Sequence, residues 1–174
     1  MSAILTPRLE LVPMTLEMVE AVMAGDRGRA EQIAGATLPE AWPGRALVER
    51  AFFASIDAIR ADPAQRLWGD RLCIAREGAR RVVGSVVFHG RPEAGIAEVG
   101  YGVEEGSQRQ GFATESTAAC VEWALAHDFV DAVRATTFAW HQASLRVMQK
   151  IGMTQVGTEQ HDVLGEMLVY ERRK

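Results

Sequence analysis

The hydrophobic pattern of the chain changes period along its length. In the first third, apolar residues recur at helical spacing, and helices are expected at residues 15–25, 26–35 and 45–61. From residue 67 onward, β-rich runs are separated by turn sequences such as EGARR and GRPEAG. Including a short first strand, the pattern predicts strands at residues 8–13, 67–75, 82–89, 96–103 and 132–138, and two more near 153–156 and 163–171.

The order of these elements indicates an α/β fold. The strands at 67–75, 82–89 and 96–103 follow one another closely enough to pair antiparallel. A helix within residues 108–127 then separates the fourth strand from the fifth, which implies a parallel crossover. A further helix is expected at about 142–151. Because no repeat, low-complexity tract or linker interrupts the chain, residues 1–174 are expected to form a single domain.

Composition and charge exclude several classes of protein. The chain is 48% apolar and 24% charged, as is usual for globular proteins, and its net charge is -4 with scattered basic residues, which disfavours a nucleic-acid partner. The longest uncharged apolar run, near residues 82–88, is far shorter than the roughly 20 residues that span a bilayer. The N-terminus lacks the unbroken apolar core of a signal peptide. A cytoplasmic protein without a membrane partner is therefore expected.

The two cysteines do not point to a metal or a disulfide. Cys73 and Cys120 lie in apolar surroundings, without the CxxC or Cys/His spacing of a zinc site. Both are expected to be reduced, buried thiols, and no metal is expected.

The stretch QRQGFATESTAACVEWALAH, which begins at Gln108, contains the main candidate for ligand binding. The first N–H groups of a helix are unpaired and lie at its positive end, which suits a phosphate. Gly111 and Ala113 leave room for the backbone to approach a ligand, and Gln108 and Arg109 add donors. Taken alone, however, a glycine before a helix is more often a simple turn residue, and the two donors fit a solvated loop equally well.

The surrounding sequence resembles the GNAT superfamily of acyl-CoA-dependent N-acyltransferases. QRQGFA matches its Q/R-x-x-G-x-G/A signature between a fourth strand and a helix, with AEVGYGV before it and ATE after it. FAWHQASLRVMQKIGM and the opening TPRLEL resemble the branch that acetylates ribosomal-protein N-termini. The similarity covers nearly the whole chain. It implies a GNAT-like, mostly antiparallel mixed sheet with helices on both faces.

The resemblance also implies acetyl-CoA as co-substrate and a way of binding it. Backbone amides of residues 108–113 would bind the pyrophosphate. The fourth strand would splay from the fifth at a bulge, opening a slot for the pantetheine arm, and a free amide near Tyr101 to Val103 would hold the thioester carbonyl. Gly100 and Gly102 suit such a distorted strand. The expected cofactor-binding residues are Tyr101, Val103, Gln108, Arg109, Gln110, Gly111, Phe112, Ala113, Thr114, His141 and Ser144.

Two residues are the leading catalytic candidates. Glu98 precedes the expected bulge and could accept a proton directly or through water, or it could pair with an arginine on the outer face. Ser144 matches the serine of the family's N-x-x-S motif, which is thought to contact the CoA sulfur, although it could instead bond backbone donors at a helix start. His141 replaces the usual asparagine of that motif, which puts the pantetheine contact in question. Weaker alternatives are Glu159, His161, Asp162 and Glu166 as bases and Tyr101 or Tyr170 as acids.

The acceptor remains open at this stage. Acetyl transfer to an amine in a ternary complex is favoured because neither cysteine has an activated setting. The acceptor could be a protein N-terminal amine or a small amine such as an aminoglycoside or polyamine, and a non-catalytic acyl-CoA-binding domain is the alternative from another class. Trp42 could line the acceptor site or anchor a loop. The sequence is compatible with a homodimer but does not fix the oligomeric state.

Overall fold

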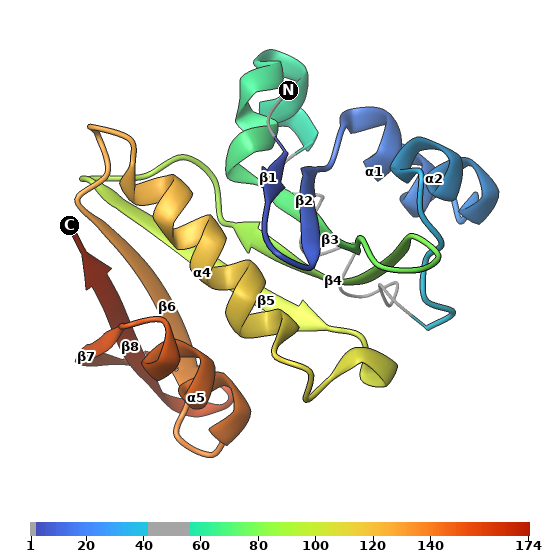
Figure 1. Cartoon of the computed structure of the whole chain (residues 1–174). Helices are drawn as coiled ribbons and strands as arrows, with labels where there is room; N and C mark the ends of the chain where they lie inside the picture. The colour runs from blue at the N-terminus through green and yellow to red at the C-terminus, as the bar shows by residue number, and fades with distance from the viewer. Residues whose placement is uncertain (1–2, 42–55) are drawn as a thin grey trace.

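The computed structural model describes residues 3–41 and 56–174, and within them eight strands form one sheet in the order β1-β2-β3-β4-β5-β6-β8-β7 (Figure 1). Neighbouring strands pair antiparallel, apart from β5 and β6, which are parallel. The mixed, mostly antiparallel sheet is thus confirmed. The strands are β1 (Ile4–Leu5), β2 (Leu9–Pro13), β3 (Asp70–Ala75), β4 (Arg81–Phe88), β5 (Ile96–Val103), β6 (Ala132–Phe138), β7 (Thr154–His161) and β8 (Gly165–Arg173).

The helices begin and end at residues with recognisable capping chemistry. The hydroxyl of Thr15 accepts a hydrogen bond from the Met18 amide, and the carboxylate of Asp26 accepts one from the Arg29 amide. Gly35 closes the second helix with a left-handed backbone. The α-helices are α1 (Leu16–Met23), α2 (Arg27–Ala34), α4 (Phe112–Leu125) and α5 (Gln142–Lys150). Residues 56–61 are also helical, whereas Trp42 and the rest of the helix predicted at 45–61 lie outside the described residues.

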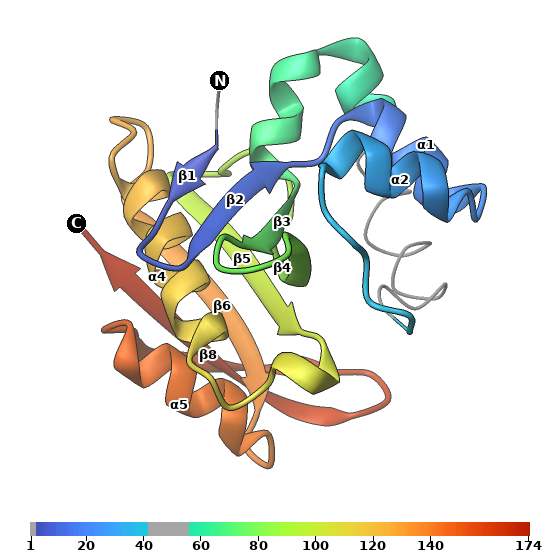
Figure 2. The ribbon, with the colours of Figure 1, turned by 45° about the vertical axis from the view of Figure 1, so that its right-hand side comes forward.

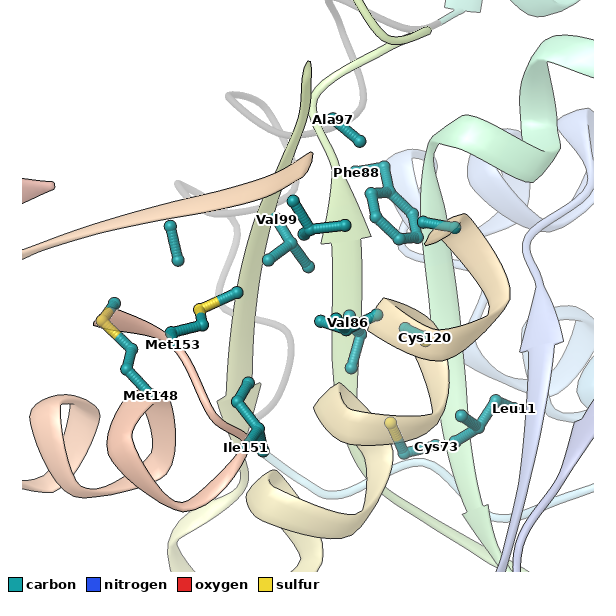
Figure 3. Close-up of a cluster of buried hydrophobic side chains, with 14 of the residues drawn as sticks. Leu11, Cys73, Val86, Phe88, Ala97, Val99, Cys120, Met148, Ile151 and Met153 are labelled. Carbon is teal, nitrogen blue, oxygen red and sulfur yellow. The ribbon is translucent and has the colours of Figure 1, made fainter. Parts of the chain in front are cut away.

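Helices cover both faces of the sheet, as expected. On one face, Met18 and Val19 of α1 belong to a buried cluster with Leu72 and Ile74 of β3. On the other face, α4 and α5 pack on a larger cluster that includes Leu11, Cys73, Val86, Phe88, Val99, Cys120 and Met148 (Figure 3). Figure 2 shows α4 crossing the sheet on the side away from α1 and α2. Consecutive strand residues therefore face different helices, which decides where each site residue points.

Several predicted boundaries differ from the structure. The strand predicted from residue 67 begins at Asp70, because Pro63–Trp68 forms a 3-10 helix whose start is capped by Asp62. A short strand, β1, precedes the predicted first strand. The last hairpin extends through residues 154–173, beyond the predicted strands near 153–156 and 163–171. The sequence of β7 is exposed and largely polar, so apolar and polar residues do not alternate clearly enough to predict its length.

The strands β5 and β6 diverge after a short parallel pairing. Ile96, Ala97 and Glu98 pair with residues 132–134 of β6, and from Val99 onward β5 is paired with β4 alone. The divergence is confirmed, but the expected bulge is not seen, since β5 pairs with β4 in one unbroken register from Val99 to Val103. A glycine is required on the neighbouring strand: a Cβ on Gly84 of β4 would lie 2.2 Å from the Gly102 carbonyl oxygen, so β4 and β5 touch backbone to backbone there, whereas a Cβ on Gly102 would meet nothing within 4 Å.

Candidate active site

The turn before α4 has the backbone shape of an anion site. Gly111, the N-cap of α4, has a φ of 82°, and Arg109 also has a positive φ of 62°. A left-handed backbone at a residue other than glycine is uncommon and costs free energy, which is often tolerated at functional sites. The two left-handed residues turn the chain so that α4 begins directly after the loop. Gln108, Arg109, Gln110 and Gly111 are all exposed.

The amides of this turn are available to a ligand. No side chain caps α4, and within the described residues the first α4 amide with a protein acceptor is that of Glu115, which donates to the Gly111 carbonyl. The N–H groups of residues 109–114 have no acceptor among these residues. Unpaired donors at the positive end of a helix stabilise a pyrophosphate. The structure thus brings Arg109, Gln110, Gly111, Phe112, Ala113 and Thr114 together as the sequence predicted, and the role of these residues remains a proposal.

An interaction that the sequence reasoning missed holds this turn in place. Arg8, just before β2, donates through Nη1 to the Gln110 carbonyl at 2.8 Å and through Nε to Glu115 at 2.7 Å. Its guanidinium also stacks on the Phe112 ring, 4.6 Å from the centroid. Glu115 accepts a further hydrogen bond from the Thr6 hydroxyl. Burial alone would raise the pKa of Glu115, but these bonds outweigh it and hold the pKa below its ordinary value.

The open side of β5 presents backbone amides to the divergence from β6. His89 donates its amide to the Glu98 carbonyl, and Glu104 donates to the Val83 carbonyl, so the even-numbered residues of β5 bond to β4. Because hydrogen-bonded pairs alternate along an antiparallel ladder, the N–H groups of Tyr101 and Val103 point to the side where β6 has left, whereas the N–H of Val99 still lies within the β5–β6 pairing. The Gln108 side chain donates to the Val103 carbonyl at 3.2 Å. The amides of Tyr101 and Val103 are therefore oriented away from β4, and their binding of a thioester stays a prediction.

Tyr101 and Ser144 meet on the α5 side of the sheet. The Tyr101 hydroxyl lies 3.0 Å from the Ser144 hydroxyl and 3.1 Å from the Ser144 carbonyl. Ser144 is buried, and its hydroxyl binds Tyr101, whereas a backbone donor was the alternative from sequence. Burial raises the pKa of the Tyr101 phenol, and the hydrogen bond with Ser144 opposes part of that rise. A protonated phenol and an alcohol in contact can pass a proton to a leaving thiolate.

Glu98 lies on the opposite face and contacts a histidine, where the sequence left an arginine as the alternative. Its Oε2 is 3.6 Å from His89 Nδ1, an ion-pair distance if the imidazole is charged, and both side chains are about half exposed. A Cβ on Gly100 would lie 3.4 Å from His89 Nε2 and 3.3 Å from Val87. Sequence reasoning missed His89, because the predicted strand bounds did not define the register that places it opposite Glu98.

His141 occupies the N-cap of α5, at the end of β6. Its ring stacks on Trp140 with 5.6 Å between centroids, and its Nδ1 lies 3.5 Å from the Thr137 hydroxyl. Its side chain is exposed beside the start of the helix that holds Ser144. The weaker candidates Glu159, His161, Asp162 and Glu166 are exposed residues of the β7–β8 hairpin.

The cysteines are unsuited to act as nucleophiles. Cys73 of β3 and Cys120 of α4 are free, and both are buried in the core between the sheet and α4. Burial raises the pKa of each thiol to about 12, which keeps both protonated at neutral pH. Among the residues that the structure describes, no group of three or more His, Cys, Asp or Glu side chains is arranged to hold a metal ion. Within the same ranges, no helix has the length and hydropathy needed to cross a membrane.

Comparison with known proteins defines the class. The family model for the acetyltransferase (GNAT) domain matches residues 8–154, and the chain belongs to this family. The fold agrees, since the parallel β5–β6 pair that diverges beside the α4 turn is the arrangement that the resemblance implied. The protein is therefore an acyltransferase of the GNAT type.

Individual relatives are distant. An uncharacterised N-acetyltransferase, YjdG, of Bacillus subtilis (strain 168) is 22% identical over 148 residues, which cover 84% of this chain and 86% of the relative. A GNAT-family acetyltransferase from Bacillus anthracis superposes with a TM-score of 0.65 at 20% identity, covering 98% of both chains. RimL, a ribosomal L7/L12 α-N-protein acetyltransferase solved with coenzyme A, has a TM-score of 0.66 at 16% identity, covering 98% of this chain and 97% of its own. These structures share the fold.

Proposed function

We propose that the protein transfers the acetyl group of acetyl-CoA directly to a primary amine within a ternary complex, and that the acceptor is the N-terminal amine of a protein. One observation carries the proposal: the amides of residues 109–114, which have no acceptor among the described residues, follow the end of the β5 segment 99–103 that has parted from β6. Diphosphate and thioester can thus be held by one continuous stretch of backbone. The coenzyme A complex of the RimL relative supports the same donor.

The residues present fit the donor. The amides at the start of α4 and the Arg109 side chain would hold the pyrophosphate, while Gly111 leaves the approach free of a Cβ. The pantetheine arm would run between β5 and β6 past His141. The amide of Tyr101 would donate to the thioester carbonyl and stabilise the negative charge that develops there on attack.

The chemistry needs one proton to leave the amine and one to reach the sulfur. The amine nitrogen attacks the carbonyl carbon, the new C–N bond forms, and the C–S bond breaks with its electrons moving to sulfur. The amine proton leaves on the face that carries Glu98, and the thiolate is protonated on the face of Tyr101 and Ser144. Because both thiols are buried and protonated, no acyl-enzyme step is involved.

The exposure of the acceptor side favours a protein terminus. Glu98 and His89 are about half exposed, so a flexible chain end can reach the reacting carbon from solvent. An α-amine has an ordinary pKa near 8, roughly two units below that of a lysine or a polyamine, so more of it is neutral and nucleophilic at physiological pH. The negative charge of Glu98 also suits an amine that arrives as a cation.

Release of free coenzyme A can be followed with a panel of acceptors. The panel contains peptides with free N-termini, the same peptides with blocked N-termini, and small polyamines and aminoglycosides. We expect turnover with free N-termini, and loss of turnover when the terminus is blocked. Preference for a small amine would replace the proposed acceptor, and binding of coenzyme A without turnover on any amine would contradict the proposed reaction.

A further inference from the structure

His89 occupies a position that no motif assigned. It directly follows β4, and its amide donates to the Glu98 carbonyl at 3.0 Å, so the two residues are direct cross-strand partners. Their side chains share one face of the sheet. Glu98 Oε2 lies 3.6 Å from Nδ1 of the His89 ring, and the other ring nitrogen, Nε2, is turned toward Gly100.

The imidazole of His89 lies over Gly100. A Cβ at Gly100 would be in van der Waals contact with His89 Nε2, at 3.4 Å. The peptide bond that follows Gly100 carries the Tyr101 amide, which points to the divergence of β5 from β6. His89 Nε2 thus lies beside the peptide that would hold the thioester carbonyl.

The sheet separates this imidazole from the Tyr101–Ser144 pair. Successive residues of a strand point to opposite faces, so Gly100 opens the face of His89, while Tyr101 reaches to Ser144 of α5 on the other. An amine that approaches over Gly100 would meet the imidazole on its own side, and the sulfur would depart toward the two hydroxyls. The proton acceptor and the proton donor are then held apart and cannot neutralise each other directly.

We propose that His89 is the catalytic base of the transfer and that Glu98 is a positioning residue for its ring. This rests on the proposed function. As the amine nitrogen bonds to the carbonyl carbon, its proton passes to Nε2 of the neutral imidazole, directly or through one water. The C–S bond breaks with its electrons moving to sulfur, and sulfur takes a proton from the Tyr101 hydroxyl. His89 then releases its proton to solvent, and the Tyr101 oxygen regains a proton from solvent, directly or through the Ser144 hydroxyl. The Glu98 carboxylate stabilises the imidazolium through Nδ1.

The test uses acetyl-CoA with whichever acceptor the panel identifies. His89→Gln and His89→Ala are expected to lower kcat about 100-fold or more, while the Kd for coenzyme A measured by calorimetry stays within about threefold. Added imidazole should restore part of the turnover of His89→Ala, which a merely structural role would not allow. Glu98→Gln should lower kcat about tenfold and leave KM for the acceptor nearly unchanged.

Two carboxylate variants make the outcome decisive. Asp70 of β3 pairs with Val87 of β4, which in turn pairs with Gly100 of β5. Its carboxyl group therefore lies in the same cross-strand row as Gly100, one strand further from the divergence, and is the alternative to Glu98. The proposal is overturned if His89→Gln keeps kcat within threefold of the wild type, or if Glu98→Gln or Asp70→Asn loses more turnover than His89→Gln. A wild type that binds coenzyme A but acetylates no amine would instead count against the proposed function.

Discussion

Gly111 combines two requirements that can be separated by experiment. Its left-handed backbone disfavours any side chain, and its amide lies in the proposed pyrophosphate site. Gly35 has a similar φ of 61° at the end of α2, away from this turn, with open space around it. Gly111→Glu and Gly35→Glu should each cost about 1 kcal/mol of stability.

Affinity for coenzyme A should distinguish the two variants. We expect Gly111→Glu to weaken binding at least about 100-fold, because a carboxylate would stand where the diphosphate binds. Gly35→Glu should bind as the wild type does. Calorimetry with coenzyme A and urea unfolding of both variants measure the two effects, and equal affinities would show that the pyrophosphate binds elsewhere.

The hydroxyls of Tyr101 and Ser144 form a pair that acts at one step. We expect Tyr101→Phe and Ser144→Ala to lower kcat about tenfold or more, with little change in the affinity for coenzyme A. Since both hydroxyls serve one proton transfer, the double variant should be little slower than the slower single variant. Steady-state kinetics of the three variants provide the measurement, and independent, multiplying losses would argue against a shared step.

At the scale of elements, the ion pair between Arg8 and Glu115 joins β2 to α4. Because Arg8 also holds the Gln110 carbonyl, Glu115→Gln should loosen the turn that presents the amides. We expect KM for acetyl-CoA to rise about fivefold with kcat little changed, and stability to fall by about 1 kcal/mol. Glu10→Gln, which breaks the comparable 2.7 Å pair with Arg80 at the other side of β2, is the control and should leave KM unchanged.

The whole molecule contains a buried carboxyl group that opposes folding at neutral pH. Asp70 is buried at the start of β3, its Oδ2 has no hydrogen-bond partner among residues 3–41 and 56–174, and burial raises its pKa to about 7. Between the ordinary pKa of about 4 and about 7, the folded state binds more protons than the unfolded chain does. The contribution of Asp70 to stability therefore falls as the pH rises through this range.

Asp70→Asn should remove that pH dependence. The variant is expected to be more stable than the wild type at pH 8 by at most about 4 kcal/mol, with a smaller difference at pH 4. Urea unfolding at the two pH values measures the change, with the exposed Asp57→Asn as control. A stability difference between Asp70→Asn and the wild type that is the same at pH 8 and at pH 4 would mean that Asp70 is solvated or paired in solution.

The sequence predicted the fold better than it predicted the site. The alternation of apolar and polar residues, with glycines in the turns, predicted β5 and β6 at their observed limits. Thr15 and Asp26 marked the starts of the first two helices. The turn at Gly111 was also foreseen, because its chemistry is local. Arg8 and His89 were missed because each acts through a partner far along the chain or across a hairpin. Such pairings depend on register and on which face a side chain takes, which periodicity alone does not define.

The alternation along β5 has a consequence for isotope labelling. In the free protein, the amide protons of Tyr101 and Val103 should exchange with deuterium faster than those of Gly100 and Gly102, which are bonded to β4. A bound thioester arm would slow the first set and leave the second unchanged. Exchange resolved residue by residue therefore reports whether the donor is in place, without an acceptor and without a single turnover.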